Sequence, residues 1–174
     1  ERSRTVEERC EKAAEIVNAE DSQCVSWCHI NKEGDALASM IDNSVQVSGS
    51  DSDEFKEESF RAFESGEIKS LITKPTIAGF GLNWQHCHRQ TFFPSHSFEQ
   101  YYQAIRRSWR FGQKKPVTID VISSEGEANV LKNLQRKAAA ASEMFDNLVA
   151  HMHEELKMEK KEQYTELNTL PKWL

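Results

Sequence analysis

QAIRRSWRFGQ, residues Gln103–Gln113, is the stretch on which the fold assignment rests, and we call it the arginine segment. Wound as a helix at about 100° per residue, it gathers its polar donors within an arc of about 100°: Gln103, Arg106, Arg107 and Arg110. The opposite side collects apolar residues that we expect in a core: Phe98, Tyr101, Tyr102, Ile105 and Trp109. Guanidinium groups fixed in this way match phosphate oxygens through bidentate hydrogen bonds. The pattern predicts a phosphate-binding helix face, and the alternative is an amphipathic helix whose arginines are solvated or ion-paired.

A second informative stretch, LITKPTIAGFGLNW, lies upstream at residues 71–84. A short apolar strand, 68–73, leads into a loop with two glycines, Gly79 and Gly81, and we call residues 79–83 the glycine loop. Glycine allows positive φ and lets backbone N–H groups approach an anion closely. Taken alone, two glycines in this spacing usually indicate a tight turn.

Together, the two stretches resemble motifs V and VI of the second RecA-like lobe of superfamily-2 helicases and translocases, nearest the Swi/Snf-like branch. Motif V reads roughly G-G-x-G-[IL]-N and is matched by Gly79, Gly81, Leu82 and Asn83. Motif VI reads roughly Q-A-x-x-R-x-x-R-x-G-Q and is matched by Gln103, Ala104, Arg107, Arg110, Gly112 and Gln113. Two positions depart from the pattern, with Ala78 for the first glycine and Trp109 where many relatives have histidine. The aromatic residues in and around these motifs (Trp84, Tyr101-Tyr102, Trp109) are similar to those of phage and prophage-encoded members.

The resemblance implies roles for individual residues. ATP would bind between two lobes, with Arg110 as the arginine finger, Arg107 as a second phosphate contact and Gln103 as an orienting group. The glycine loop would contribute Gly79, Gly81 and Asn83 to the ATP site. Contacts to nucleic acid are expected from Thr76, Ser48, Gly49, Lys114 and Lys115. Arg106 lies off the motif, and a surface salt bridge is as consistent with its position as a functional role.

Short apolar strands alternate with helices along the chain. Strands are expected at 24–30, 44–47, 68–73, 89–93 and 117–122, and helices at 5–18, 32–41, 54–65 and from 97 to Gly112. This alternation predicts an α/β fold, a RecA-like parallel sheet flanked by helices on both faces, with a C-terminal helical extension. We expect the lobe at residues 1–137 and the charged extension at 138–174. In the helix at 54–65, Phe55, Phe60 and Phe63 should face inward.

The chain lacks the phosphate-cradling sequence G-x-x-x-x-G-K-[ST]. Asp53-Glu54 is better explained as acid at a helix N-terminus than as a metal-binding box. ATP and Mg²⁺ would therefore be held mainly by an N-terminal RecA-like lobe of the same full-length protein. Because the chain begins with Glu1 rather than Met, we expect it to be a piece of such a protein, inactive as an ATPase on its own. The competing hypothesis is a non-catalytic RecA-like module that binds nucleic acid or a partner protein.

The formal net charge of −6 is unusual for a nucleic-acid-binding protein, but the charge is distributed unevenly. Acidic residues concentrate at 1–20, 51–67 and 143–166, whereas basic residues gather between 106 and 115. Salt screens charges beyond about 10 Å, so a local basic stripe can contact duplex DNA, which is the expected track.

The sequence has no long apolar run and no signal-peptide pattern, so we expect no membrane partner and a location in the cytoplasm of a bacterial or phage-infected cell. The sequence contains 4 cysteines. Cys24 and Cys28 share a face of one strand about 13 Å apart, too far to bind one ion. We expect core cysteines and no metal site.

Overall fold

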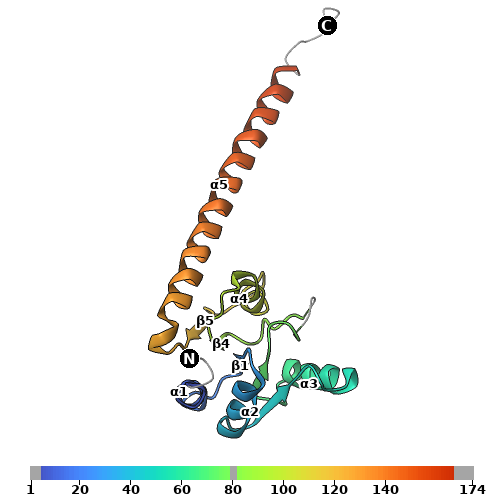
Figure 1. Ribbon diagram of the computed structural model, residues 1–174. Helices are drawn as coiled ribbons and strands as arrows, with labels where there is room; N and C mark the ends of the chain where they lie inside the picture. The colour runs from blue at the N-terminus through green and yellow to red at the C-terminus, as the bar shows by residue number, and fades with distance from the viewer. Residues whose placement is uncertain (1–4, 79–81, 167–174) are drawn as a thin grey trace, which may run out of the picture. The chain divides into compact units, whose positions relative to one another are not determined.

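The structure is a computed structural model that describes residues 5–78 and 82–166. The chain divides into two compact units, residues 1–134 and 135–174. The first contains a sheet with its covering helices, and the second continues the last helix (Figure 1). A boundary between lobe and extension at residue 137 remains a prediction. Within the described ranges, no helix combines the length and apolar composition that crossing a bilayer requires.

The first unit is built on a sheet of five strands, all paired in parallel. The strands are β1 (Cys24–Trp27), β2 (Ser44–Val47), β3 (Ser70–Thr73), β4 (Arg89–Phe92) and β5 (Thr118–Val121), in the order β2-β3-β1-β4-β5. Val25 in the central strand pairs with Leu71 on one side and Gln90 on the other. The expected α/β, RecA-like parallel sheet is confirmed.

Helices cover both faces of the sheet, as predicted. The described helices of the chain are α1 (Val6–Asn18), α2 (Asn31–Met40), α3 (Asp53–Ser65), α4 (Phe98–Ile105), a short 3₁₀ helix η1 (Glu125–Glu127) and α5 (Ala128–Glu166). Successive side chains of a strand point to opposite faces. Cys24 therefore packs with α1 and α2 in one core, while Val25 and Trp27 pack with α3 and α4 in the other.

Helix ends follow the sequence in some places and depart from it in others. Ser97 caps α4, since its side chain accepts a hydrogen bond from the Gln100 N–H, and Gly66 ends α3 with φ of 87°. The Thr5 side chain caps nothing and instead accepts a hydrogen bond from Arg9 Nε. The expected inward position of Phe55 is wrong, because that ring is 43% exposed in the first turn of α3, while Phe63 is fully buried.

A buried ion cluster formed by Arg9, Glu33 and Glu127 joins α1, α2 and η1. Arg9 Nη2 donates to Glu33 Oε1 at 3.0 Å, and Arg9 Nε lies 3.5 Å from Glu127 Oε2. The guanidinium also lies 4.9 Å from the centre of the Phe93 ring. Buried charges cost stability unless they are paired, so this cluster fixes the three elements in one arrangement.

Candidate phosphate-binding site

The arginine segment leaves the helical path after Ile105, where α4 ends and a run of turns begins. The prediction of one helix continuing through Arg110 is therefore wrong. Gly112 adopts φ of 95°, and a side chain there would meet the Gln85 amide at 3.2 Å. The positive φ strains any other residue at this position, and a Cβ would also have to displace the Gln85 amide by a few tenths of an ångström.

Hydrogen bonds tie these turns to the loop at residues 82–88. The Trp84 N–H donates to the Arg107 carbonyl oxygen at 2.9 Å, and Gln85 Nε2 donates to the Phe111 carbonyl oxygen. Nε2 of Gln113 donates to two loop carbonyl oxygens, those of Gln85 at 2.9 Å and Cys87 at 3.3 Å. Gln113, a motif VI residue, thus positions the segment and does not reach outward.

Two buried residues anchor the segment to the sheet, Ala104 and Ser108. Ser108 Oγ accepts a hydrogen bond of 2.8 Å from Gln90 Nε2, and Gln90 Oε1 accepts one of 2.9 Å from Trp27 Nε1. Sequence reasoning missed this chain of side chains. A serine among arginines, such as Ser108, has the sequence pattern of an exposed residue. Only the tertiary structure brings Gln90 beneath it.

Arg107 and Arg110 converge on one acceptor, the carbonyl oxygen of Leu82 in the glycine loop. Nη1 of each guanidinium donates to the Leu82 carbonyl oxygen at 3.5 Å. Burial lowers the pKa of Arg107, and the positive charge of Arg110 lowers it further. Two like charges held side by side favour an anion, which would neutralise both. Gly79 and Gly81, the other expected contributors, lie outside the described residues, and Asn83 is exposed next to Leu82.

A pocket of about 320 Å³ lies beside Arg107. Its lining comes from the segment after β3 and the start of α4: Pro75, Thr76, Ser97, Glu99, Gln100, Gln103 and Arg107. Gln103 Nε2 donates to Glu99 Oε1 at 3.1 Å. The pocket therefore brings together three predicted site residues, Thr76, Gln103 and Arg107, at the carboxyl ends of β3 and β4, the edge where open α/β sheets bind ligands.

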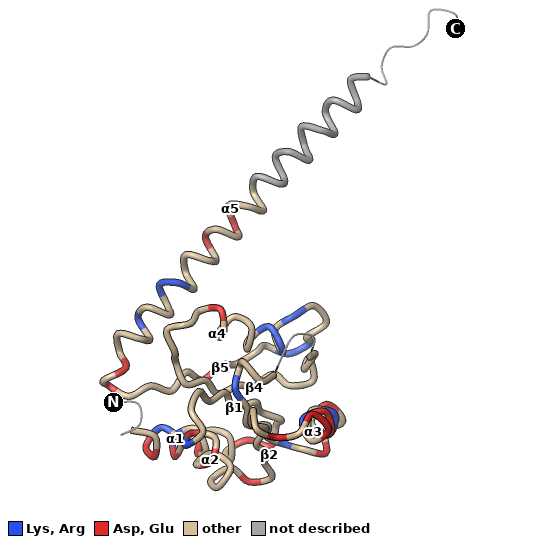
Figure 2. Tube along the Cα trace, turned by 45° about the vertical axis from the view of Figure 1, so that its right-hand side comes forward, with Lys and Arg blue, Asp and Glu red and all other residues tan. Residues whose placement is uncertain are grey.

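The expected core position of Trp109 is wrong. Its ring is 55% exposed, because the helix ends before it, and Ile105 is only partly buried. The Arg106 guanidinium lies over two rings, 6.0 Å from Tyr102 and 5.4 Å from Trp109. Arg106 thus stacks on aromatic rings. Figure 2 shows Lys and Arg gathered along the turns that follow α4.

Ser48 and Gly49 line or border a different, polar hollow. The hollow measures about 230 Å³ and includes Ser48, Asp35 and Asp51 in its lining. The Ser48 N–H donates to Asp51 Oδ2 at 2.7 Å, and Gly49 faces open space. This hollow follows β2 and therefore lies on the carboxyl edge of the sheet, like the pocket beside Arg107.

Lys114 and Lys115 are exposed and precede β5. Since all strands are parallel, the amino end of β5 lies on the opposite edge of the sheet from the pocket at Gln103. The Lys115 charge lies near His88, whose pKa is lowered first by burial and then by that charge. The structure does not bring the two lysines together with Thr76 or Ser48.

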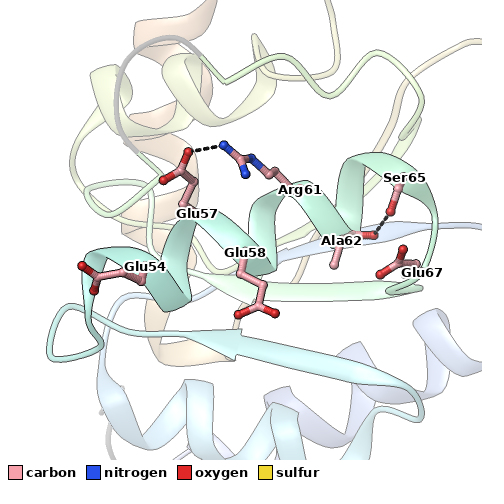
Figure 3. A pocket seen from close by; sticks show the side chains of 7 residues that line it. All are labelled: Glu54, Glu57, Glu58, Arg61, Ala62, Ser65 and Glu67. Atoms are coloured by element: carbon pink, nitrogen blue, oxygen red, sulfur yellow. Dashed lines mark hydrogen bonds and ion pairs between the residues drawn. The ribbon is translucent and has the colours of Figure 1, made fainter.

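Another hollow, of about 630 Å³, lies along α3 and is acidic (Figure 3). Its lining includes Glu54, Glu57, Glu58 and Glu67, with Arg61 paired to Glu57. Several carboxylates gathered in one hollow repel a phosphate group, so this hollow is a poor site for a nucleotide. Asp53 in the first turn of α3 pairs with Lys56 at 3.2 Å, consistent with a helix N-terminus.

The four cysteines are buried free thiols, as expected. Burial raises the pKa of Cys10 and Cys87 to about 11, and it also raises the pKa of Cys24 and Cys28. Among the residues that the structure describes, no group of three or more His, Cys, Asp or Glu residues is placed to hold a metal ion.

Comparison with solved structures finds the same fold in the C-terminal part of an ATPase domain, in an RNA-helicase and in the C-terminal domain of a DEAD-box protein. The C-terminal part of the Fun30 ATPase domain has a TM-score of 0.64 and 16% identity over 72% of this chain and 44% of that chain. The RNA-helicase Prp28 from Chaetomium thermophilum, bound to ADP, gives 0.65 and 22% over 79% and 35%. The C-terminal domain of Dbp5 from S. cerevisiae, bound to Gle1 and IP6, gives 0.64 and 14% over 76% and 79%.

The chain thus spans less than half of the Fun30 and Prp28 chains and most of the Dbp5 domain. At these identities the likeness establishes the fold. No family model matches the chain, and no curated protein sequence matches it.

Proposed function

We propose that the chain is the second RecA-like lobe of an ATP-dependent helicase or translocase of superfamily 2, nearest the Swi/Snf-like branch and acting on duplex DNA. The observation that carries the proposal is the convergence of Arg107 and Arg110 on the carbonyl oxygen of Leu82, a glycine-loop residue. The shared fold with C-terminal helicase domains supports it. The aromatic residues Trp84 and Trp109 support the assignment to a phage-encoded branch.

The donor set fits the phosphates of ATP. Arg107, Arg110 and Gln103 offer N–H donors, the Glu99 carboxylate beside them accepts a hydrogen bond from Gln103, and the sequence contains no G-x-x-x-x-G-K-[ST] stretch. We therefore assign the metal and the phosphate cradle to a first RecA-like lobe. ATP supplies the reactive phosphoanhydride, and the arginines of this chain would neutralise the charge that develops during phosphoryl transfer.

The turns after α4 give these arginines a fixed position. Gln113 and Trp84 hold the backbone of the segment, and Ser108 attaches it to the sheet through Gln90. A catalytic cation acts best when it needs no reorganisation during the reaction. Closure of two lobes around ATP would place Arg107 and Arg110 against the phosphates, and opening after hydrolysis would move the glycine loop and Thr76 along the nucleic acid.

Binding of the chain to duplex DNA is expected to be weak and steeply dependent on salt. Replacing Lys114 and Lys115 by alanine should lower affinity equally for unrelated sequences and flatten the slope of log K against log salt by about one unit per lost phosphate contact. The measurement is fluorescence anisotropy at several salt concentrations.

A matched control removes two exposed lysines from α1 and α2, Lys12 and Lys32. This control should leave the slope unchanged. An unchanged slope in the Lys114/Lys115 variant would instead confine DNA contacts to the carboxyl edge of the sheet, at Thr76 and Ser48, and remove the lysines from the site.

A further inference from the structure

A carboxylate lines the candidate phosphate site, although its charge is unfavourable there. Glu99 and Arg107 both line the pocket of about 320 Å³ at the carboxyl ends of β3 and β4. Among the residues that the structure describes, neither of the two forms an ion pair. A negative charge beside a phosphate weakens binding of the phosphate, so a carboxylate at this place needs a role of its own.

The hydrogen bond between Glu99 and Gln103 sets the orientation of the Gln103 amide. Gln103 Nε2 donates to Glu99 Oε1 at 3.1 Å, across one turn of α4. An ionised carboxylate has only acceptor atoms, so the amide must turn its NH2 group, and not its oxygen, toward Glu99. Within the described ranges of the chain, no group donates to Gln103 Oε1. The carbonyl oxygen of Gln103 is therefore the acceptor that this contact leaves available.

Both ends of this hydrogen bond stand on a well-anchored helix turn. Residues four apart lie on the same side of a helix, which places Glu99 next to Gln103. The Ser97 side chain caps the turn by accepting a hydrogen bond of 3.3 Å from the Gln100 N–H. Ala104, the neighbour of Gln103, is buried against the sheet. The backbone thus fixes where the two side chains start, and the hydrogen bond removes the remaining rotation of the amide.

We propose that Glu99 is a positioning residue for ATP hydrolysis, which holds the Gln103 carbonyl oxygen where it accepts a hydrogen bond from the attacking water. The inference rests on the proposed function, in which Gln103 is an orienting group beside the phosphates. A glutamine amide can orient a water molecule for attack on a phosphate. The reversed amide would present its NH2 group, which only donates, to that water.

The chemical step is ordinary hydrolysis, and Gln103 takes no proton in it. The water oxygen bonds to the γ-phosphorus while the bond from that phosphorus to the leaving oxygen of ADP breaks. One water proton stays on the phosphate product and the other is released. Glu99 touches neither ATP nor water in this scheme, because it acts only through Gln103.

A purely structural role for Glu99 predicts a different result. A carboxylate in the first turn of a helix interacts favourably with the helix dipole, and a side-chain pair four residues apart adds to helix stability. In that case the loss of Glu99 would lower the midpoint of unfolding and leave kcat of the folded protein unchanged. A positioning role predicts a fall in kcat under conditions where the protein stays folded.

The kinetic test uses the two-lobe protein and separates kcat from KM. Glu99→Ala should lower kcat by about tenfold to 10²-fold, because misplacement of a group at the reacting atoms has an effect of this size. KM for ATP should stay the same or fall, since the substitution removes a negative charge beside the phosphates. Glu57→Ala removes an exposed carboxylate that is paired four residues along α3, so it is the matched control and should change neither constant. A raised KM with unchanged kcat in Glu99→Ala would overturn the proposal.

A double-mutant cycle tests whether Glu99 acts through Gln103. In a Gln103→Ala background, Glu99→Ala should leave kcat within about twofold, because no amide remains to be oriented. Glu99→Gln keeps the size of the side chain but offers a donor as well as an acceptor, so its kcat should lie between those of the parent and Glu99→Ala. A loss of kcat in the Gln103→Ala background as large as in the parent would contradict the proposal, since Glu99 would then act independently of the amide.

The hydrogen bond itself can be measured without ATP. In the 174-residue chain, the side-chain NH2 of Gln103 gives a pair of NMR signals that is identified by its loss in Gln103→Ala. Glu99→Ala should move this pair toward the values of solvent-exposed amides, and Glu57→Ala should leave it in place. A pair that stays in place in Glu99→Ala would overturn the contact and the proposal with it. Failure of the proposed function shows separately, as a kcat of the two-lobe protein that does not depend on Arg110.

Discussion

Replacing Arg110 with alanine in the two-lobe protein is expected to reduce kcat for ATP hydrolysis by ~10³-fold or more, with a smaller change in nucleotide affinity. The reason is electrostatic, because a fixed guanidinium at the phosphates stabilises charge that appears mainly in the transition state. Arg107→Ala should act in the same direction, since both guanidinium groups meet at the Leu82 carbonyl. Steady-state ATPase assays at saturating ATP measure the effect.

Arg106→Ala is the matched control within the same segment. Its guanidinium stacks on Tyr102 and Trp109 rather than pointing to the Leu82 carbonyl, so kcat should stay close to that of the parent protein. A value within about threefold of the parent for Arg110→Ala would show that Arg110 is not the finger.

Replacing Glu33 with alanine should lower the free energy of unfolding by ~3–5 kcal/mol. Glu33 is fully buried, and its carboxylate accepts hydrogen bonds from Arg9 at 3.0 Å and from the His29 N–H at 2.8 Å. Its loss leaves the first turn of α2 without a cap and leaves the buried Arg9 with less compensating charge. Urea unfolding followed by circular dichroism gives the change from the midpoint and slope.

Glu57→Ala supplies the comparison for an exposed ion pair. Glu57 pairs with Arg61 on the surface of α3, and both side chains are well exposed, so its loss should cost less than about 1 kcal/mol. Equal destabilisation by the two substitutions would mean that the buried cluster does not hold α1, α2 and η1 together.

The sheet was predictable because each strand carries its own local pattern. Short apolar runs bounded by turns, with helices between them, are sufficient to predict parallel strands, and β2 at Ser44–Val47 was located to the residue. The sheet order was not predicted, and it depends on pairings between strands distant in the sequence, such as Val25 with Leu71 and Gln90.

The arginine segment shows where local pattern stops being informative. Its residues fit a helical wheel through Arg110, yet the helix ends at Ile105. The competing forces are non-local, since Gln113 and Trp84 hold the backbone in turns through hydrogen bonds to residues far away in the sequence. Arg107 and Gln103 nevertheless line one pocket. The motif match that singled them out rested on residue identities rather than on helical periodicity, so it did not depend on where the helix ends.

The buried ion cluster was missed for a related reason. Arg9 and Glu33 are charged residues on amphipathic helices, and such residues are almost always exposed. Glu33 stands three residues after Ile30, at a position where a carboxylate can accept backbone N–H groups of the first turn, and this was the available signal. Its burial depends on Arg9 and could not be read from α2 alone.

ATP hydrolysis by each lobe alone and by the two lobes joined tests the shared-site account most directly. The 174-residue chain alone should show no magnesium-dependent turnover above background, with or without DNA, because it carries no phosphate cradle. The first lobe alone should be equally inactive, and the joined protein should turn over ATP in a manner that depends on Arg110. Turnover by highly purified 174-residue chain that Arg110→Ala abolishes would contradict the account, because the site would then be complete within this chain.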